Sequence, residues 1–127
     1  MSASYLLDTH VLLWWLDDPG KLSPAVRDAI ADPDSRVLLS VASACEMKIK
    51  QSLVRLEIPT DLAAVLRQTE IDVLDIKLAH AVAIADLPNH HRDPFDRMLI
   101  AQAQLESLVI MTRDSKFSAY VVDVLEA

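Results

Sequence analysis

Four acidic residues stand where apolar segments of the chain end, and their types and positions suit metal chemistry. Apolar segments pack inward, and a buried carboxylate is costly unless a partner compensates its charge. If the segments form adjacent strands and helix starts, the four carboxylates converge on one pocket, where a cation would hold them together. The sequence therefore predicts a metal site built from Asp8, Glu46, Asp96 and Asp114.

Each of these acids also has an adequate structural explanation when it is taken alone. Asp8 suits a helix N-cap, although Thr9 could cap the same helix. Glu46, with Ser43 as N-cap, would complete a capping box of the form S-x-x-E. Asp114 fits a turn. A single site at one end of a sheet nevertheless explains the acids together more simply than separate coincidences do.

The segment DPFD (93–96) holds the densest group of candidates. We expect Asp93 to cap a helix that begins with the proline, which leaves Asp96 in the first turn with its carboxylate near the helix start. His90 and His91 lie just upstream. Adjacent histidines point in different directions, and no cysteine or suitably spaced histidine accompanies them, so we discount a zinc site.

Alternating strands and helices must position these residues, and the apolar pattern predicts such an order. Short runs that are apolar at every position are typical of parallel strands covered on both faces. Ligands of such α/β sheets bind beyond the carboxyl ends of the strands. Asp75, at the end of the third expected strand, is a decoy that could cap the helix starting at Lys77. We expect strands at 4–8, 37–41, 71–76, 108–112 and 119–124, and helices at about 10–17, 24–31, 43–55, 59–69, 77–87 and 94–106.

The composition narrows the class of protein. With 127 residues, 52% of them hydrophobic and 24% charged, the chain suits a single globular domain over 1–127. Its single glycine, Gly20, excludes glycine-rich phosphate-binding loops, and its single cysteine, Cys45, excludes an internal disulfide and suits a reducing compartment. The start lacks the pattern of a signal peptide, and no apolar run could span a bilayer. We therefore expect a cytoplasmic protein without membrane contact.

The net charge of −7 argues against non-specific nucleic-acid binding through a broad basic surface. Divalent cations held by the acids would, however, make the field in the pocket less negative than the formal count. Basic residues also flank three of the four acids. Composition therefore leaves a nucleic-acid substrate open without supporting it.

Four segments, in their order along the chain, resemble the PIN domain, and specifically the VapC-type toxins of bacterial toxin–antitoxin pairs. The segments are YLLDTHVLLWWL, SACEMKIKQSLVRLEIP, LPNHHRDPFDRMLIAQA and LVIMTRDSKF. The resemblance covers almost the whole chain, although residues 61–85 match only in pattern. It implies a PIN-like α/β/α sandwich with a mainly parallel sheet of about five strands.

The resemblance also implies a magnesium-dependent ribonuclease site, in which manganese can substitute, that hydrolyses RNA with metal-activated water. The family's acidic quartet falls on Asp8, Glu46, Asp96 and Asp114, with Asp93, Thr112 and Lys50 as auxiliary residues. We expect the RNA backbone to be held by Arg97, Arg113 or Lys116. The implied partners are a cognate antitoxin protein and a second copy of the chain in a homodimer.

Two other interpretations remain open from the sequence. A receiver-like signalling domain also gathers acids around magnesium, and Asp75 would be its only candidate phosphoacceptor. Alternatively, the chain is a catalytically inactive PIN-like scaffold that only binds a partner. Phosphodonor labelling tests the first interpretation, and a metal-dependent nuclease assay tests the second.

Overall fold

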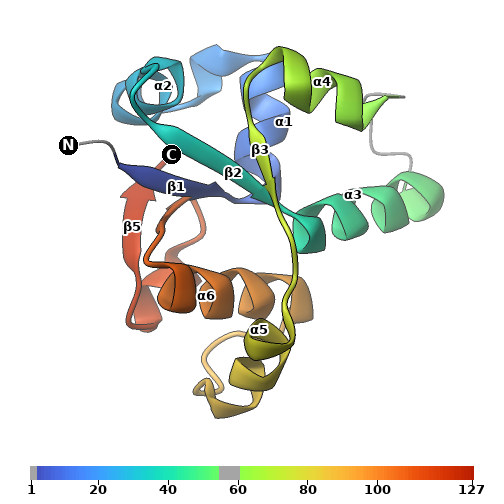
Figure 1. Cartoon of the computed structure of the whole chain (residues 1–127), viewed down its shortest axis with the longest axis vertical. Coiled ribbons are helices and arrows are strands. Elements are labelled where there is room, and N and C mark those ends of the chain that lie inside the picture. Colours follow the sequence, from blue (N-terminus) through green and yellow to red (C-terminus); the bar gives the residue numbers. More distant parts are fainter. Residues whose placement is uncertain (1–2, 55–60) are drawn as a thin grey trace.

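The computed structural model describes residues 3–54 and 61–127, and its centre is a parallel sheet. The sheet has five strands in the order β3-β2-β1-β4-β5, and every neighbouring pair is parallel (Figure 1). The predicted α/β class with a parallel five-stranded sheet is thus confirmed. The strands are β1 (Ser4–Leu7), β2 (Arg36–Ser40), β3 (Asp72–Leu74), β4 (Val109–Thr112) and β5 (Asp123–Glu126).

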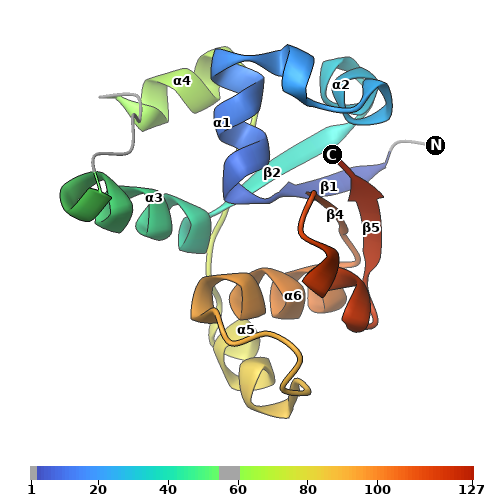
Figure 2. The same ribbon diagram turned by 180° about the vertical axis from the view of Figure 1, so that it is seen from behind.

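Helices cover both faces of this sheet. Helices α1, α2 and α4 lie on one side of it, and α5 and α6 on the other, as the two opposite views show (Figures 1 and 2). Helix α3 extends outward from the end of β2. The described helices are α1 (Thr9–Asp17), α2 (Pro24–Ala31), α3 (Val41–Val54), α4 (Leu62–Gln68), α5 (Leu78–Ala83) and α6 (Pro94–Glu106), with 3₁₀ turns η1 (Pro19–Lys21), η2 (Ile84–Asp86) and η3 (Ser115–Ala119).

Consecutive residues of a strand point into two separate hydrophobic cores, one on each face of the sheet. Side chains alternate between the faces along a strand, so both members of each adjacent apolar pair are buried. This arrangement explains why the strands read as continuous apolar runs. Leu7, Leu39 and Met111 belong to the core beneath α1 and α2, whereas Leu6, Leu38 and Ile110 belong to the core beneath α6.

The last strand differs from the prediction. The segment expected to be a strand at 119–124 begins instead with the end of η3, and β5 starts only at Asp123. Phe117 and Tyr120, three residues apart, are both buried in the core under α6, and this spacing suits a tight helical turn. Val121, which would have been central to the predicted strand, is 90% exposed.

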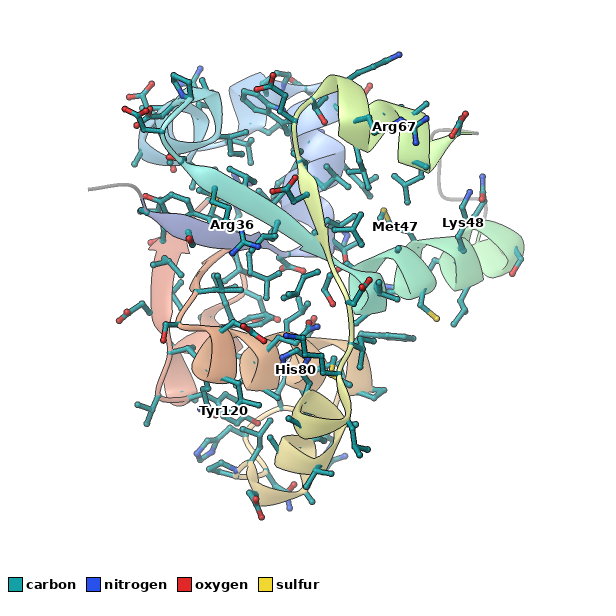
Figure 3. All side chains as sticks on the ribbon, in the orientation of Figure 1. Arg36, Met47, Lys48, Arg67, His80 and Tyr120 are labelled. Atoms are coloured by element: carbon teal, nitrogen blue, oxygen red, sulfur yellow. The ribbon has the colours of Figure 1, made fainter. Side chains whose placement is uncertain are left out.

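The helix expected at 77–87 is shorter in the structure, and the apolar side chains expected to be buried are turned toward solvent. Its apolar residues Leu78 and Val82 are 81% and 61% exposed, whereas His80 is buried between α5 and α6 (Figure 3). His80 Nδ1 accepts the backbone N–H of Lys77 at 3.0 Å, and Nε2 lies 2.9 Å from Glu106 Oε1. The hydrogen bond of His80 to Glu106 therefore helps to hold this helix against α6, and the predicted apolar positions Leu78 and Val82 do not.

Other boundaries moved by a few residues. The third strand covers only Asp72–Leu74, and Lys77, not Asp75, is the N-cap of α5, so the capping role suggested for Asp75 is wrong. The predicted start of the fourth helix at 59–60 lies outside the described residues, and Asp61 caps α4. Among the described residues, no helix is both long enough and apolar enough to cross a membrane.

Candidate metal centre

A pocket of about 290 Å³ is lined by residues that follow β1 and β4, by residues of α1 and α3, and by residues at the start of α6. All the predicted acids line it: Asp8, Glu46, Asp96 and Asp114. Asp93, Lys50 and Arg113 from the predicted auxiliary and RNA-binding sets also line it, as do His10, Val11, Trp14 and His91.

Asp8 joins β1 to α1, and its carboxylate contacts the first residue of α1 and the last residue of β4. Its Oδ1 accepts the backbone N–H of Thr9 at 2.7 Å, so Asp8 is the N-cap of the helix and Thr9 its first residue. Its Oδ2 accepts a 2.8 Å hydrogen bond from the Thr112 hydroxyl. The same hydroxyl oxygen accepts the backbone N–H of Asp114 at 3.0 Å. Thr112 therefore connects two of the predicted ligands directly.

Glu46 is held by side chains and not by a capping box. Ser40 Oγ accepts the backbone N–H of Ala42 at 3.0 Å, and α3 starts at Val41, two residues earlier than predicted. Ser43 thus lies inside the helix, and the capping-box interpretation is wrong.

The carboxylate of Glu46, which is 5% exposed, has two partners from different helices. Its Oε1 accepts a 2.6 Å hydrogen bond from the hydroxyl of Thr9, on α1. Its Oε2 lies 3.0 Å from Lys50 Nζ, one turn further along α3. A buried charge needs such partners, and they fix the direction in which Glu46 points.

The start of α6 agrees with the prediction. Asp93 is the N-cap, and its Oδ1 accepts the backbone N–H groups of Phe95 at 2.8 Å and Asp96 at 3.3 Å. Pro94 is the first helical residue. Asp96 therefore lies in the first turn, with its carboxylate at the pocket.

His91 is the pocket residue that the sequence interpretation set aside. Its ring is 8% exposed, and Nε2 lies 2.8 Å from Asp96 Oδ2 and 3.3 Å from Asp114 Oδ2. His90 is exposed and contacts the Tyr120 ring edge-on, so the two histidines do point in different directions. The sequence does contain a feature that distinguishes the two histidines. In an extended segment, the side chains of His91 and Asp93, two residues apart, point to the same side.

The electrostatics of the pocket favour a bound cation. Burial is the largest cause of a shift that raises the pKa of Asp96 to about 8, and the negative charges of Asp8, Asp93, Glu46 and Asp114 contribute the rest of that shift. Burial also raises the pKa of Asp8, against the opposing hydrogen bonds from Thr112 and Thr9.

The donor set fits a hard divalent ion. Carboxylate oxygens are the ligands that magnesium and manganese prefer, and a cation would relieve the repulsion that raises the pKa of Asp96. One ligand atom from each of His91, Asp96 and Asp114 lies within 4.8 Å of the others.

The three predicted RNA-binding residues differ in their surroundings. Arg97 donates to the carbonyl oxygens of Pro88 at 2.9 Å and Ile84 at 3.0 Å, and these inward contacts argue against an RNA contact. Arg113 lies over the Trp14 ring at 4.3 Å. The side chain of Lys116 is exposed beside Asp114.

Arg113 also has backbone partners. Its guanidinium donates to the carbonyl oxygens of Lys21 and Ala127, the second at 2.8 Å. These contacts orient the side chain along one wall of the pocket.

Comparisons with known proteins agree with this fold. The chain is 26% identical over 118 residues to Ribonuclease VapC22 of Mycobacterium tuberculosis. The aligned residues cover 91% of this chain and 90% of that protein. The structure resembles VapBC2 from Rickettsia felis bound to a promoter DNA fragment, with a TM-score of 0.75, 12% identity and coverage of 97% and 98%. It also resembles VapBC-5, a toxin–antitoxin family member from Mycobacterium tuberculosis, with a TM-score of 0.60, 23% identity and coverage of 98% and 97%.

The family model for the PIN domain matches residues 5–122, which include every acid of the pocket. This match spans far more than half of the 127 residues. The chain therefore belongs to the PIN domain family.

Proposed function

We propose that this chain, as a single PIN domain, is a VapC-type ribonuclease toxin whose acidic pocket binds magnesium and hydrolyses RNA. Manganese is expected to substitute, because it accepts the same oxygen ligands. The convergence of four carboxylates in one pocket carries the proposal. The match to the PIN family and the similarity to Ribonuclease VapC22 support it.

Each acid has a separate part in this proposal. Asp8 and Asp96 are the principal ligands, because both are partly buried at the pocket and each has a raised pKa that a cation would relieve. Glu46 and Asp114 complete the set directly or through water, since magnesium retains several waters. A bound magnesium ion supplies an acidified water and neutralises phosphate charge.

The remaining pocket residues hold the acids and the substrate. Thr112 orients Asp8, and Thr9 and Lys50 orient Glu46. We assign Arg113 and Lys116 to the RNA backbone, because Arg113 lines the acidic pocket and Lys116 is an exposed cation two residues after Asp114. Arg97 is left out of this set because it does not line the acidic pocket, and its guanidinium donates to the carbonyl oxygens of Pro88 and Ile84.

The partners follow from the toxin–antitoxin relatives. VapBC-5 belongs to a toxin–antitoxin family, and this likeness supports a cognate antitoxin as partner of the present chain. We further propose that the chain forms a homodimer, as VapC-type toxins resembling it do. Its RNA substrate and its antitoxin would both be met in the cytoplasm.

The receiver-like alternative has less support. Its only candidate phosphoacceptor, Asp75, follows the edge strand β3, and the lining of the acidic pocket does not include it. Labelling of Asp75 by a small phosphodonor would restore that alternative. The scaffold alternative predicts no metal-dependent cleavage at all.

Sequencing of RNA ends after induced expression tests the proposal. New 5′-phosphate ends are expected with the wild-type chain and not with Asp8→Asn, which retains the side-chain shape but removes a charge. Co-expression of a cognate antitoxin should suppress these ends. Identical ends from the wild type and Asp8→Asn would contradict the assignment of the pocket as the active site.

A further inference from the structure

We propose that His91 is a positioning residue of the acidic pocket, which holds the carboxylates of Asp96 and Asp114 together through its Nε2–H group and is not itself a metal ligand. This inference rests on the proposed metal site. It gives a role to a side chain that lies among the candidate ligands.

The hydrogen bonds of the ring determine which nitrogen carries the proton. Nδ1 of His91 accepts the backbone N–H of Asp93 at 3.2 Å. A neutral imidazole has one acceptor nitrogen and one donor nitrogen, so the proton is on Nε2. The Nε2–H group then donates to Asp96 Oδ2 at 2.8 Å and to Asp114 Oδ2 at 3.3 Å. In this tautomer Nε2 has no lone pair with which to bind an ion.

The position of His91 is fixed independently of the two carboxylates. Its ring packs edge-on against Phe117, with the ring centroids 6.0 Å apart. Its backbone N–H donates to the Tyr120 hydroxyl at 2.8 Å, and its carbonyl oxygen accepts from Arg97 at 3.3 Å. The imidazole is therefore a rigid donor presented to the pocket and does not simply follow the acids.

A donor at this point has a clear effect on metal binding. Asp96 comes from the first turn of α6 and Asp114 from the end of β4, so no local backbone geometry fixes one carboxylate relative to the other. Before an ion arrives, repulsion between negative charges opposes the ionisation of both carboxyl groups at once. His91 offsets this repulsion and pre-organises the two oxygens, as outer partners of metal ligands commonly do.

Calorimetric titration with magnesium chloride tests the inference on four proteins: the wild type, His91→Ala, His91→Gln and His90→Ala. His91→Ala should weaken magnesium binding by roughly 10- to 100-fold, the usual effect of losing such a partner. His91→Gln should recover much of the affinity, because its amide N–H can reach the same carboxylates. His90→Ala is the matched control and should bind as the wild type does.

A spectroscopic measurement on the wild type keeps the inference testable even if His91→Ala does not fold. The ¹⁵N chemical shifts of His91 should report a protonated Nε2 both before and after magnesium is added. Loss of the Nε2 proton on metal binding would show direct ligation and overturn the proposal, as would equal magnesium affinity in His91→Ala and the wild type.

The controls separate this inference from the proposed function. If the wild type binds no magnesium, the proposed metal site fails and His91 loses its role with it. If the wild type binds magnesium and His91→Ala binds equally well, only the inference about His91 fails. Weaker binding by both His90→Ala and His91→Ala would indicate a general effect of the loop and would also overturn it.

Discussion

The hydroxyl of Thr9 lies 2.6 Å from Glu46 Oε1, in a buried hydrogen bond that joins the first turn of α1 to α3 across 37 positions of the chain. Lys50 contacts the other oxygen of the same carboxylate at 3.0 Å. Glu46 is therefore held at the pocket by one side chain of its own helix and one of another. The orientation of Glu46 as a candidate metal ligand therefore depends on its contacts with both Thr9 and Lys50.

Thr9→Val should weaken magnesium binding about tenfold, because valine keeps the shape of threonine but cannot orient Glu46. The free energy of unfolding should fall by about 1–3 kcal/mol, since a buried acceptor loses its donor. Calorimetry and urea unfolding measure the two effects. Thr69→Val is the matched control: its hydroxyl donates to the Val65 carbonyl within α4, so magnesium binding should not change.

The metal-free protein should become less stable as the pH rises from about 5 to 8. Asp96 has a pKa of about 8 in the folded chain, against 3.8 as its ordinary value. The folded state therefore binds more protons than the unfolded state in this range, and stability is lost as the pH approaches the folded pKa. His80 lowers the pKa of Glu106, whose contribution is lost only at lower pH, below the range measured.

Urea unfolding in the presence of a chelator measures this pH dependence. Asp96→Asn should flatten the slope, because its side chain does not titrate. Asp75→Asn, which alters an exposed acid outside the pocket, should keep the wild-type slope. A wild-type stability that is constant or rises between pH 5 and 8 would contradict the account of Asp96.

Arg97→Met should lower the free energy of unfolding by about 2–3 kcal/mol, because each lost hydrogen bond to a charged donor costs on this order. The guanidinium joins the first turn of α6 to carbonyl oxygens at Ile84 and Pro88. Thermal and urea unfolding measure the loss. An unchanged stability together with weaker RNA binding would restore the RNA contact predicted from the sequence.

Lys116→Ala should behave in the opposite way. Its side chain is exposed, so stability should change by no more than about 0.5 kcal/mol. RNA binding should weaken, and its dependence on salt concentration should become shallower, because one cation next to phosphate is lost. Filter binding to RNA at several salt concentrations measures both. Unchanged binding at low salt would remove Lys116 from the proposed RNA surface.

Local signals made part of this structure predictable. The pairs Ser23-Pro24 and Asp93-Pro94 start α2 and α6 as expected, because an N-cap followed by proline acts within a few residues. The continuous apolar runs correctly indicated buried parallel strands. The convergence of the acids then followed from the carboxyl ends of neighbouring strands meeting at one edge.

The missed features depend on partners that are distant in the sequence. Ser40 and Ser43 are both plausible caps for α3, and the choice depends on where β2 leaves the sheet. Thr9 turned out to hold Glu46, a role that a cap position does not suggest. His91 became part of the pocket only because Asp114, 23 residues away, meets the start of α6 there.

Cleavage of bacterial total RNA by purified protein in magnesium, compared for the wild type, Asp96→Asn and Asp75→Asn, tests the central claim most directly. We predict cleavage by the wild type and Asp75→Asn that stops when the metal is chelated. Asp96→Asn should lose at least about 100-fold in rate, since metal stabilisation of the transition state is worth several kcal/mol. Full cleavage by Asp96→Asn in magnesium would contradict the claim that these carboxylates form a metal-dependent nuclease site.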